Sequence, residues 1–137
     1  MVATDRAIEL THLAAEAAAD KLGANIVAFD VSDQLAIADT FLIVTAKNER
    51  QVGAVVDAIE ERLLAQKVKP LRREWDREAR WVLLDYGDLI VHVQHPDERR
   101  LYALERLWRD CPPIELTVVE APADASDEDV RLEGERE

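Results

Sequence analysis

The sequence has few of the residues from which many catalytic and metal sites are built. It contains a single cysteine, Cys111, so no internal disulfide can form, and no metal-ligand spacing surrounds that thiol. Its four glycines stand far apart, so a glycine-rich loop for phosphate is absent. Neither of its serines lies in a nucleophile-elbow sequence. We therefore expect no cofactor, no metal and no catalytic residue.

Long hydrophobic runs are also missing. No apolar run reaches the roughly 18 residues that a membrane-spanning helix needs. The first residues show no basic region followed by an apolar stretch, so they do not resemble a secretory signal. We expect a cytoplasmic protein that makes no membrane contact.

Positive charge is scarce, since the net charge at pH 7 is -12. Proteins that wrap nucleic acid need clustered Lys and Arg, so we expect no direct nucleic-acid readout. Residues 112–137 contain nine acidic residues and two arginines, and from Ala121 onward they include no aromatic residue. Such a segment cannot bury enough surface to offset its ordering entropy. We expect one domain over residues 1–111 and an acidic, disordered tail over residues 112–137.

The hydrophobic spacing predicts the order helix, two strands, helix, three strands, helix. We expect helices over residues 5–22, 49–66 and 97–109 and strands over residues 26–31, 41–45, 68–75, 80–86 and 88–94. Gly87 should supply the positive φ of a hairpin turn, and Pro70 should place its strand at an edge or at a strand entry. This order predicts an α/β (α+β) fold, a mixed five-stranded sheet with packed helices.

Several acidic residues lie beside the predicted strands, and paired acids can hold Mg²⁺ for nucleotidyl transfer. They are Asp30, Asp33, Asp39, Asp85 and Asp88. No phosphate-binding loop accompanies them, so we interpret them as turn formers and strand caps. His92 and His95 are three residues apart, which on a strand directs them to opposite faces, so a metal site is not expected.

Four of the chain's few aromatic residues lie between positions 81 and 108, together with a pair of arginines. Aromatic and arginine side chains are enriched at protein contact surfaces, so this stretch suggests a recognition face, although the same residues can fill a core. For Trp108, near the end of the last helix, we favour the core. For Trp81, at the start of a strand after a polar stretch, we favour a half-exposed anchor.

Several spaced segments resemble the Iojap family of bacterial ribosomal silencing factors, and the resemblance covers about residues 5–109. Its carriers are residues 26–31 (IVAFDV), 37–45 (IADTFLIVT), 50–52 (RQV), 81–88 (WVLLDYGD), 90–92 (IVH), 99–102 (RRLY) and 104–108 (LERLW). The sequence departs from the family pattern at Ala46 and at Trp75, where family members usually have glycine.

The resemblance implies a nucleotidyltransferase-like fold without the catalytic site. It implies binding to the large ribosomal subunit through the ribosomal protein numbered fourteen, at the intersubunit face. Joining of the small subunit would be blocked, which represses translation under nutrient limitation, and a homodimer is also suggested. By motif position, the partner-binding residues would be Trp81, Tyr86, Arg99, Arg100 and Tyr102.

Two other functions compete with this one. A magnesium-dependent nucleotidyltransferase would use Asp30, Asp33 or Asp85. An adaptor would use the acidic tail to recruit another basic partner. Co-sedimentation with ribosomal subunits and a nucleotide-binding assay discriminate among these readings.

Overall fold

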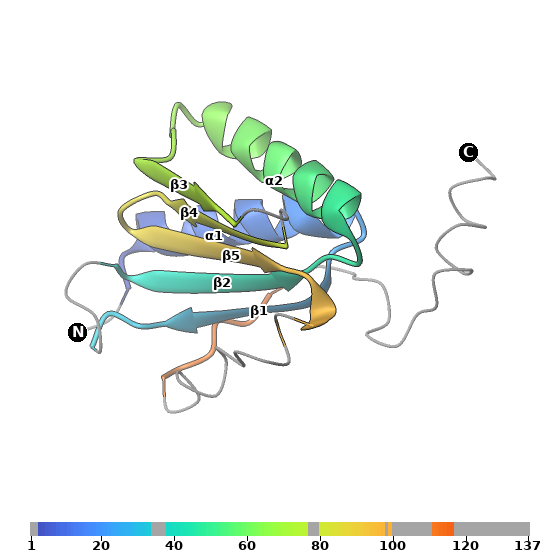
Figure 1. Cartoon of the computed structure of the whole chain (residues 1–137). Coiled ribbons are helices and arrows are strands. Elements are labelled where there is room, and N and C mark those ends of the chain that lie inside the picture. Colours follow the sequence, from blue (N-terminus) through green and yellow to red (C-terminus); the bar gives the residue numbers. More distant parts are fainter. Residues whose placement is uncertain (1–2, 34–37, 77–79, 98, 100–110, 117–137) are drawn as a thin grey trace.

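The computed structural model describes residues 3–33, 38–76, 80–97, 99 and 111–116, in which two helices pack on a five-stranded sheet (Figure 1). The elements are α1 (Asp5–Asp20), β1 (Ala24–Asp30), β2 (Thr40–Thr45), α2 (Glu49–Leu64), β3 (Arg72–Trp75), β4 (Trp81–Asp85) and β5 (Leu89–Gln94). The predicted fold class and the predicted order of these seven elements are confirmed.

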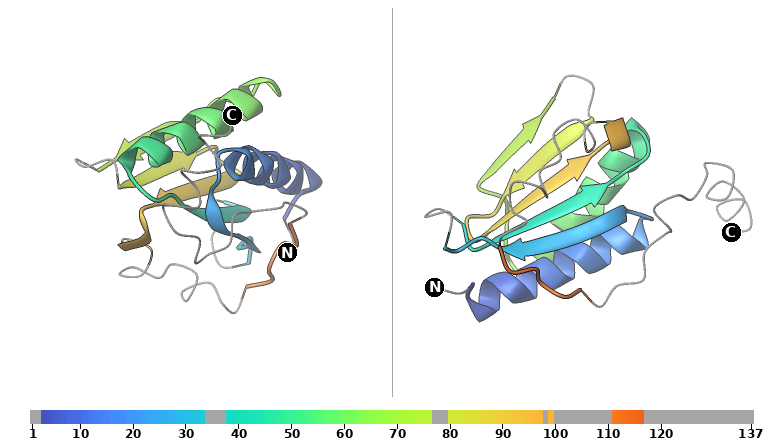
Figure 2. Two further views of the ribbon diagram at one scale, coloured as in Figure 1. Left: turned by 90° about the vertical axis from the view of Figure 1, so that its right-hand side faces the viewer. Right: turned by 90° about the horizontal axis from the view of Figure 1, so that it is seen from below.

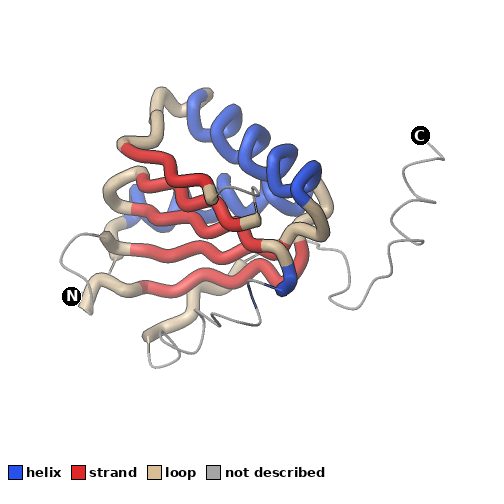
Figure 3. The backbone as a smooth tube through the Cα atoms, in the orientation of Figure 1, coloured by secondary structure: helices blue, strands red, loops and turns tan. Residues whose placement is uncertain are grey.

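The strands lie in the order β1-β2-β5-β4-β3, side by side in Figure 3. β2 pairs with β5 in parallel, and the other neighbours are antiparallel, so the sheet is mixed as predicted. β3 forms one edge, and all four of its residues are exposed. Gly87 has φ +88° in the turn between β4 and β5, which confirms its predicted role.

Both helices cover one face of the sheet (Figure 2). Small alanines on α1 allow it to approach the strands closely, while the apolar positions of α2 follow the helical period. The buried side chains of α2 are Val52, Val55, Val56, Ile59 and Leu63. They meet the alternate residues of β4 and β5 that point toward this layer, which form the main core.

The opposite face of the sheet carries a second, smaller apolar cluster. Its buried members are Val31, Ala38, Phe41, Ile90 and Cys111, with Phe29 and Leu83 packed against them. Both central strands, β2 and β5, are therefore buried on both faces. This second face also carries Trp81 and His92, because side chains alternate along each strand.

Residues 111–116 run beside β1, which would otherwise be an edge (Figure 1, orange). The amide of Asp30 donates to the carbonyl of Pro112 at 2.8 Å, and the amide of Ile114 donates to the carbonyl of Ala28 at 2.8 Å. The start of the segment that the sequence assigns to the acidic tail thus pairs with the sheet. Residues 117–137 lie outside the described residues.

The end of one helix and the start of one strand differ from the sequence expectation. Helix α1 ends at Asp20, two residues before its predicted end at Leu22, and Leu22 takes the left-handed conformation with φ 65°. Gly23 is needed for space, since a Cβ there would lie 2.7 Å from Cγ1 of Val44. Strand β3 begins at Arg72, after Pro70. The predicted helix over residues 97–109 lies mostly outside the described residues.

Candidate interaction surface

Trp81 begins β4 at the accessible end of the second face and is half-buried. Its indole Nε1–H donates a hydrogen bond of 3.0 Å to Nδ1 of His92 on β5, and the two ring centroids are 5.9 Å apart. On the other side of His92 lies Phe41 of β2, with a centroid separation of 5.1 Å. The three rings therefore form a row across β4, β5 and β2.

His92 is 5% exposed, so its imidazole is held in an apolar environment. Burial disfavours the charged imidazolium and lowers the pKa of His92 to about 4. The side chain is neutral at physiological pH, and a neutral imidazole offers one nitrogen as an acceptor. That state matches the bond it accepts from Trp81.

A groove of about 300 Å³ lies where β3 ends and β4 begins. Its lining residues are Glu74, Trp75, Asp76, Trp81 and Leu83. Trp75 is 45% exposed, which is unusual for so large an apolar side chain. Two of these lining residues are aromatic and two are acidic, and Glu74 also forms an ion pair with Arg72 at 3.6 Å, so the groove combines an apolar surface with charged groups, as protein contact surfaces do.

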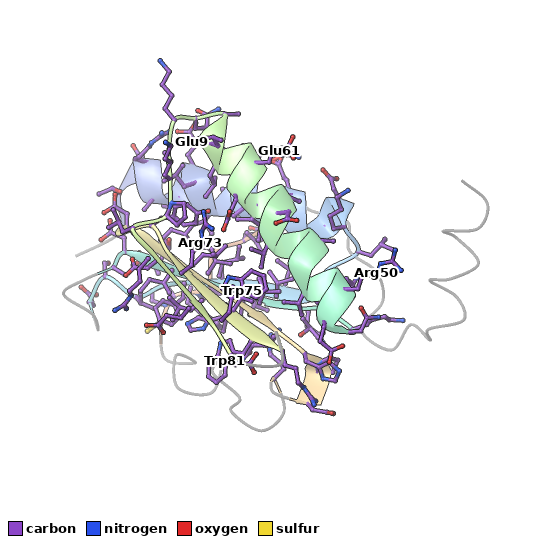
Figure 4. The ribbon with its side chains drawn as sticks, turned by 45° about the horizontal axis from the view of Figure 1, so that its top comes forward. Glu9, Arg50, Glu61, Arg73, Trp75 and Trp81 are labelled. Carbon is purple, nitrogen blue, oxygen red and sulfur yellow. The ribbon has the colours of Figure 1, made fainter. Side chains whose placement is uncertain are left out.

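The two tryptophans reach this groove from different faces. Trp75 pairs with Val82, which faces α2, whereas Trp81 lies on the face away from α2. Figure 4 shows Trp75 on the α2 side of the strands and Trp81 on the other side. The groove therefore follows the end of the sheet rather than one flat face.

Polar contacts fix the backbone around Trp81. Oδ1 of Asp76 accepts the amide N–H of Arg80 at 2.6 Å and that of Trp81 at 3.4 Å. The Arg80 guanidinium reaches Oδ2 of Asp97 at 2.9 Å, which links the start of β4 to the segment after β5. The position of Trp81 is set from both sides.

The structure buries two of the residues that the resemblance assigns to the contact surface. Tyr86 is 7% exposed and belongs to the core beneath α2. Burial raises the pKa of Tyr86, and the nearby carboxylate of Glu60 raises it further, against the effect of Arg73. Among the residues that the structure describes, no hydrogen-bond partner meets its phenol oxygen. Tyr86 therefore supports the core and does not belong to the accessible surface.

The alternation of side chains along a strand would have shown from the sequence alone that Tyr86 and Trp81 point to opposite faces of the sheet. The two residues are five positions apart, and residues an odd number apart on a strand point to opposite faces. Tyr86 continues the alternation of Val82 and Leu84, which face α2. One strand cannot present both aromatic rings on the same face.

Arg99 is also buried, with 7% exposure, and its Nη1 donates to Oγ1 of Thr45 at 2.8 Å. The resemblance assigns Arg99 to the contact surface, but its guanidinium is turned inward to the end of β2. Arg100, Tyr102 and Trp108 lie outside the described residues. Of the three predicted contact residues that the structure describes, Trp81 is the one at an accessible groove.

Sequence reasoning identified neither the hydrogen-bond partner of His92 nor the place of Trp75 in the groove. The register of the hairpin could have been derived from the sequence, because a short turn at Gly87 places His92 opposite Leu83 and diagonal to Trp81. The apolar run around His92 predicts a hydrogen-bonded strand histidine, and the structure confirms this with Trp81 as the donor. Trp75 was noted only as a departure from the family pattern.

The acidic residues considered for catalysis are engaged in local structure. Asp30 accepts hydrogen bonds from the amide of Ala3 at 2.8 Å, the amide of Ser32 at 3.0 Å and the hydroxyl of Ser32 at 2.6 Å. Burial would raise the pKa of Asp30, but these bonds outweigh it and lower the pKa below the usual value. The carboxylate thus anchors the start of the chain to β1.

Asp85 has a similar structural role, since it accepts the amide N–H of Gly87 at 2.8 Å and closes the hairpin. Within the described ranges, no group of three or more His, Cys, Asp or Glu side chains is placed to hold a metal ion. No helix in the same ranges combines the length and apolarity that crossing a membrane requires.

Comparison with known proteins identifies relatives over most of the chain. The family described as "ribosomal silencing factor during starvation" matches residues 4–137, which extends beyond the 5–109 covered by the motifs. A ribosomal silencing factor RsfS from Halalkalibacterium halodurans is 43% identical over 108 residues, covering 79% of this chain and 92% of the relative. One from Bacillus subtilis is 40% identical over 107 residues, covering 78% and 91%.

Solved structures agree with these matches. A crystal structure from Bacillus halodurans superimposes with a TM-score of 0.69 at 40% identity, covering 79% of this chain and 98% of the other. An X-ray structure of a protein from Chromobacterium violaceum gives a TM-score of 0.71 at 31% identity, covering 85% and 97%. Sequence and fold together show that the chain belongs to the ribosomal silencing factor (RsfS) family.

Proposed function

We propose that this protein represses translation by binding the large ribosomal subunit and sterically blocking the joining of the small subunit. The contact would be the ribosomal protein numbered fourteen, at the intersubunit face. Family membership supports a ribosomal role, since the relatives are named ribosomal silencing factors. The observation that carries the proposal is Trp81, an aromatic anchor fixed at the edge of an accessible groove.

Charge supports a basic protein partner. Glu74 and Asp76 lie at the rim of the groove, and the whole chain carries a net charge of -12. A protein bound to ribosomal RNA needs Lys and Arg to neutralise phosphate, and basic side chains at the border of that contact would suit these carboxylates. Attraction between the two should speed encounter and weaken as salt is added.

Arg100 and Tyr102 stay proposed contacts because they match the family motif. Tyr86 and Arg99 are not proposed as direct contacts, because both side chains are buried. We place the protein in the cytoplasm, where translation occurs, and a homodimer before ribosome binding stays a prediction.

We also propose that the protein acts without catalysis. The carboxylates of Asp30 and Asp85 already accept hydrogen bonds that hold the N-terminal residues and the hairpin. Isothermal calorimetry with the common nucleoside triphosphates and Mg²⁺ should give no heat beyond dilution. Micromolar binding that Asp33→Ala abolishes would support the nucleotidyltransferase alternative instead.

The binding proposal is tested by co-sedimentation with purified subunits. The wild-type chain should pellet with large subunits and stay in the supernatant with small subunits. Trp81→Ala should reduce the bound fraction at least tenfold, since truncating a central aromatic anchor costs about 2 kcal/mol or more.

Leu64→Ala is a matched control for that variant. Leu64 is exposed and apolar but ends α2, on the opposite side of the sheet from Trp81. Its removal should leave binding unchanged. Pelleting with neither subunit, or equal loss in both variants, would contradict the proposal.

A further inference from the structure

Among the residues that the structure describes, one neighbouring side chain accepts a hydrogen bond from the indole of Trp81. Trp81 lies directly opposite Gln94 in the β4–β5 register, and His92 is its diagonal neighbour. The indole nevertheless bonds to His92, while the amide of the fully buried Gln94 meets no hydrogen-bond partner in the described part of the chain. Of these two neighbours on β5, His92 is therefore the one that fixes the direction of the indole N–H.

The geometry defines the protonation state that this role requires. Because Nδ1 of His92 accepts the indole proton, the imidazole proton must be on Nε2. A protonated imidazolium would present a donor to a donor and would break the contact. Burial keeps His92 neutral, in agreement with its lowered pKa.

His92 is itself held in place. Phe41 packs against the imidazole with an interplanar angle of 45°, and the strand around His92 is buried on both faces. Phe41 comes from β2, which pairs in parallel with β5, so the support comes from the rigid centre of the sheet. Phe41 thus limits the movement of the His92 ring, and His92 in turn limits the movement of the half-buried Trp81 at the margin of the sheet.

We propose that His92 is a positioning residue for partner binding, which accepts the Trp81 indole N–H and so holds the anchor in its binding orientation before the partner arrives. A side chain that is already ordered loses less conformational entropy when it binds. This inference rests on the proposed function, because it assigns His92 a role at the same surface. It adds that the groove is built in the free protein.

Two variants separate the hydrogen bond from the bulk of the ring. His92→Leu fills similar volume but cannot accept a hydrogen bond, whereas Oδ1 of the amide in His92→Asn lies near the place of Nδ1 and can accept one. Gln94→Met is a matched control, since this neighbour is equally buried and makes no bond to the indole. Thermal unfolding of each variant first establishes that it is folded.

The first readout is the indole N–H resonance of Trp81 in the free, ¹⁵N-labelled protein, assigned with Trp81→Phe. In His92→Leu the resonance should shift upfield and exchange with water at least tenfold faster. In His92→Asn and Gln94→Met it should keep its protection within a factor of about three. A protected, unshifted resonance in folded His92→Leu would overturn the proposal.

The second readout is affinity for the large subunit. His92→Leu should weaken binding about tenfold, His92→Asn should restore most of that loss, and His92→Leu should add nothing when Trp81 is already Phe. Equal loss in the Leu and Asn variants would overturn the positioning role. Failure of the wild type to bind contradicts the proposed function instead, and the indole resonance tests the hydrogen bond independently of it.

Discussion

Nη1 of Arg99 donates a hydrogen bond of 2.8 Å to Oγ1 of Thr45, although 54 residues separate them in the chain. The bond joins the segment after β5 to the end of β2. Both side chains are buried, at 7% and 6% exposure, so the guanidinium needs this acceptor. An arginine from the family motif is thus buried against the end of β2 in the free protein.

Thr45→Val tests that relationship, because valine keeps the shape of threonine and removes the acceptor. We expect the free energy of unfolding to fall by about 2 kcal/mol, the range for a hydrogen bond to a charged group. Urea denaturation measures this, with Thr45→Ser as the control that keeps the hydroxyl. Equal stability of the valine variant and the wild type would show that the bond contributes nothing.

Truncation distinguishes two parts of the acidic extension. Deleting residues 121–137 should leave the unfolding midpoint nearly unchanged, because this segment lacks apolar periodicity. Deleting residues 112–137 should cost about 2 kcal/mol or more, because it also removes the backbone pairing with β1 and the packing of Ile114 and Leu116. Thermal unfolding of both truncated proteins measures this difference. Equal midpoints would contradict a stabilising role for residues 112–116.

The side chain of Gln51 on α2 links the start of that helix to the end of α1. We expect the protein to lose stability when the amide Nε2 of Gln51 can no longer donate hydrogen bonds. Its Oε1 accepts the amide of Lys47 at 2.6 Å, and its Nε2 donates to the carbonyls of Lys21 at 3.0 Å and Leu22 at 3.1 Å. Gln51→Glu keeps the acceptor but turns a carboxylate toward two carbonyls. We expect it to destabilise at least as much as Gln51→Ala, by about 1 to 2 kcal/mol in chemical denaturation. A glutamate variant as stable as the wild type would contradict this account.

His92 makes stability depend on pH. Its pKa is about 4 when folded, against 6.5 when exposed, so below pH 6.5 the unfolded chain binds a proton that the folded chain refuses. Stability should therefore fall as the pH drops from 6.5 toward 4, by up to about 3 kcal/mol from this group. His92→Leu should lose this component, as measured by urea unfolding at several pH values. Parallel pH profiles for the two proteins would show that His92 does not titrate as described.

Periodicity explains why most of the fold could be predicted. The valines and isoleucine of α2 repeat at helical spacing, and Gly87 marks the hairpin, so local signals define these elements. The end of α1 was misplaced because Leu22 takes the left-handed conformation that usually indicates glycine. Packing explains the position of the glycine, since Gly23 lies where the chain passes Val44 and a Cβ would not fit.

The interaction surface was less predictable because it depends on register and on distant contacts. The position of Trp81 followed from its place at a strand start. The burial of Tyr86 followed from alternation, but only once the face toward α2 was known. The inward turn of Arg99 depends on Thr45, and no local pattern joins residues so far apart in sequence.

Inhibition of subunit joining tests the central claim most directly. Light scattering follows association of purified small and large subunits after addition of the wild-type chain, folded Trp81→Ala or Leu64→Ala. We expect the wild type and Leu64→Ala to suppress joining equally and Trp81→Ala to need at least tenfold more protein for the same effect. Joining at the uninhibited rate with saturating wild type, or equal inhibition by folded Trp81→Ala, would contradict the account.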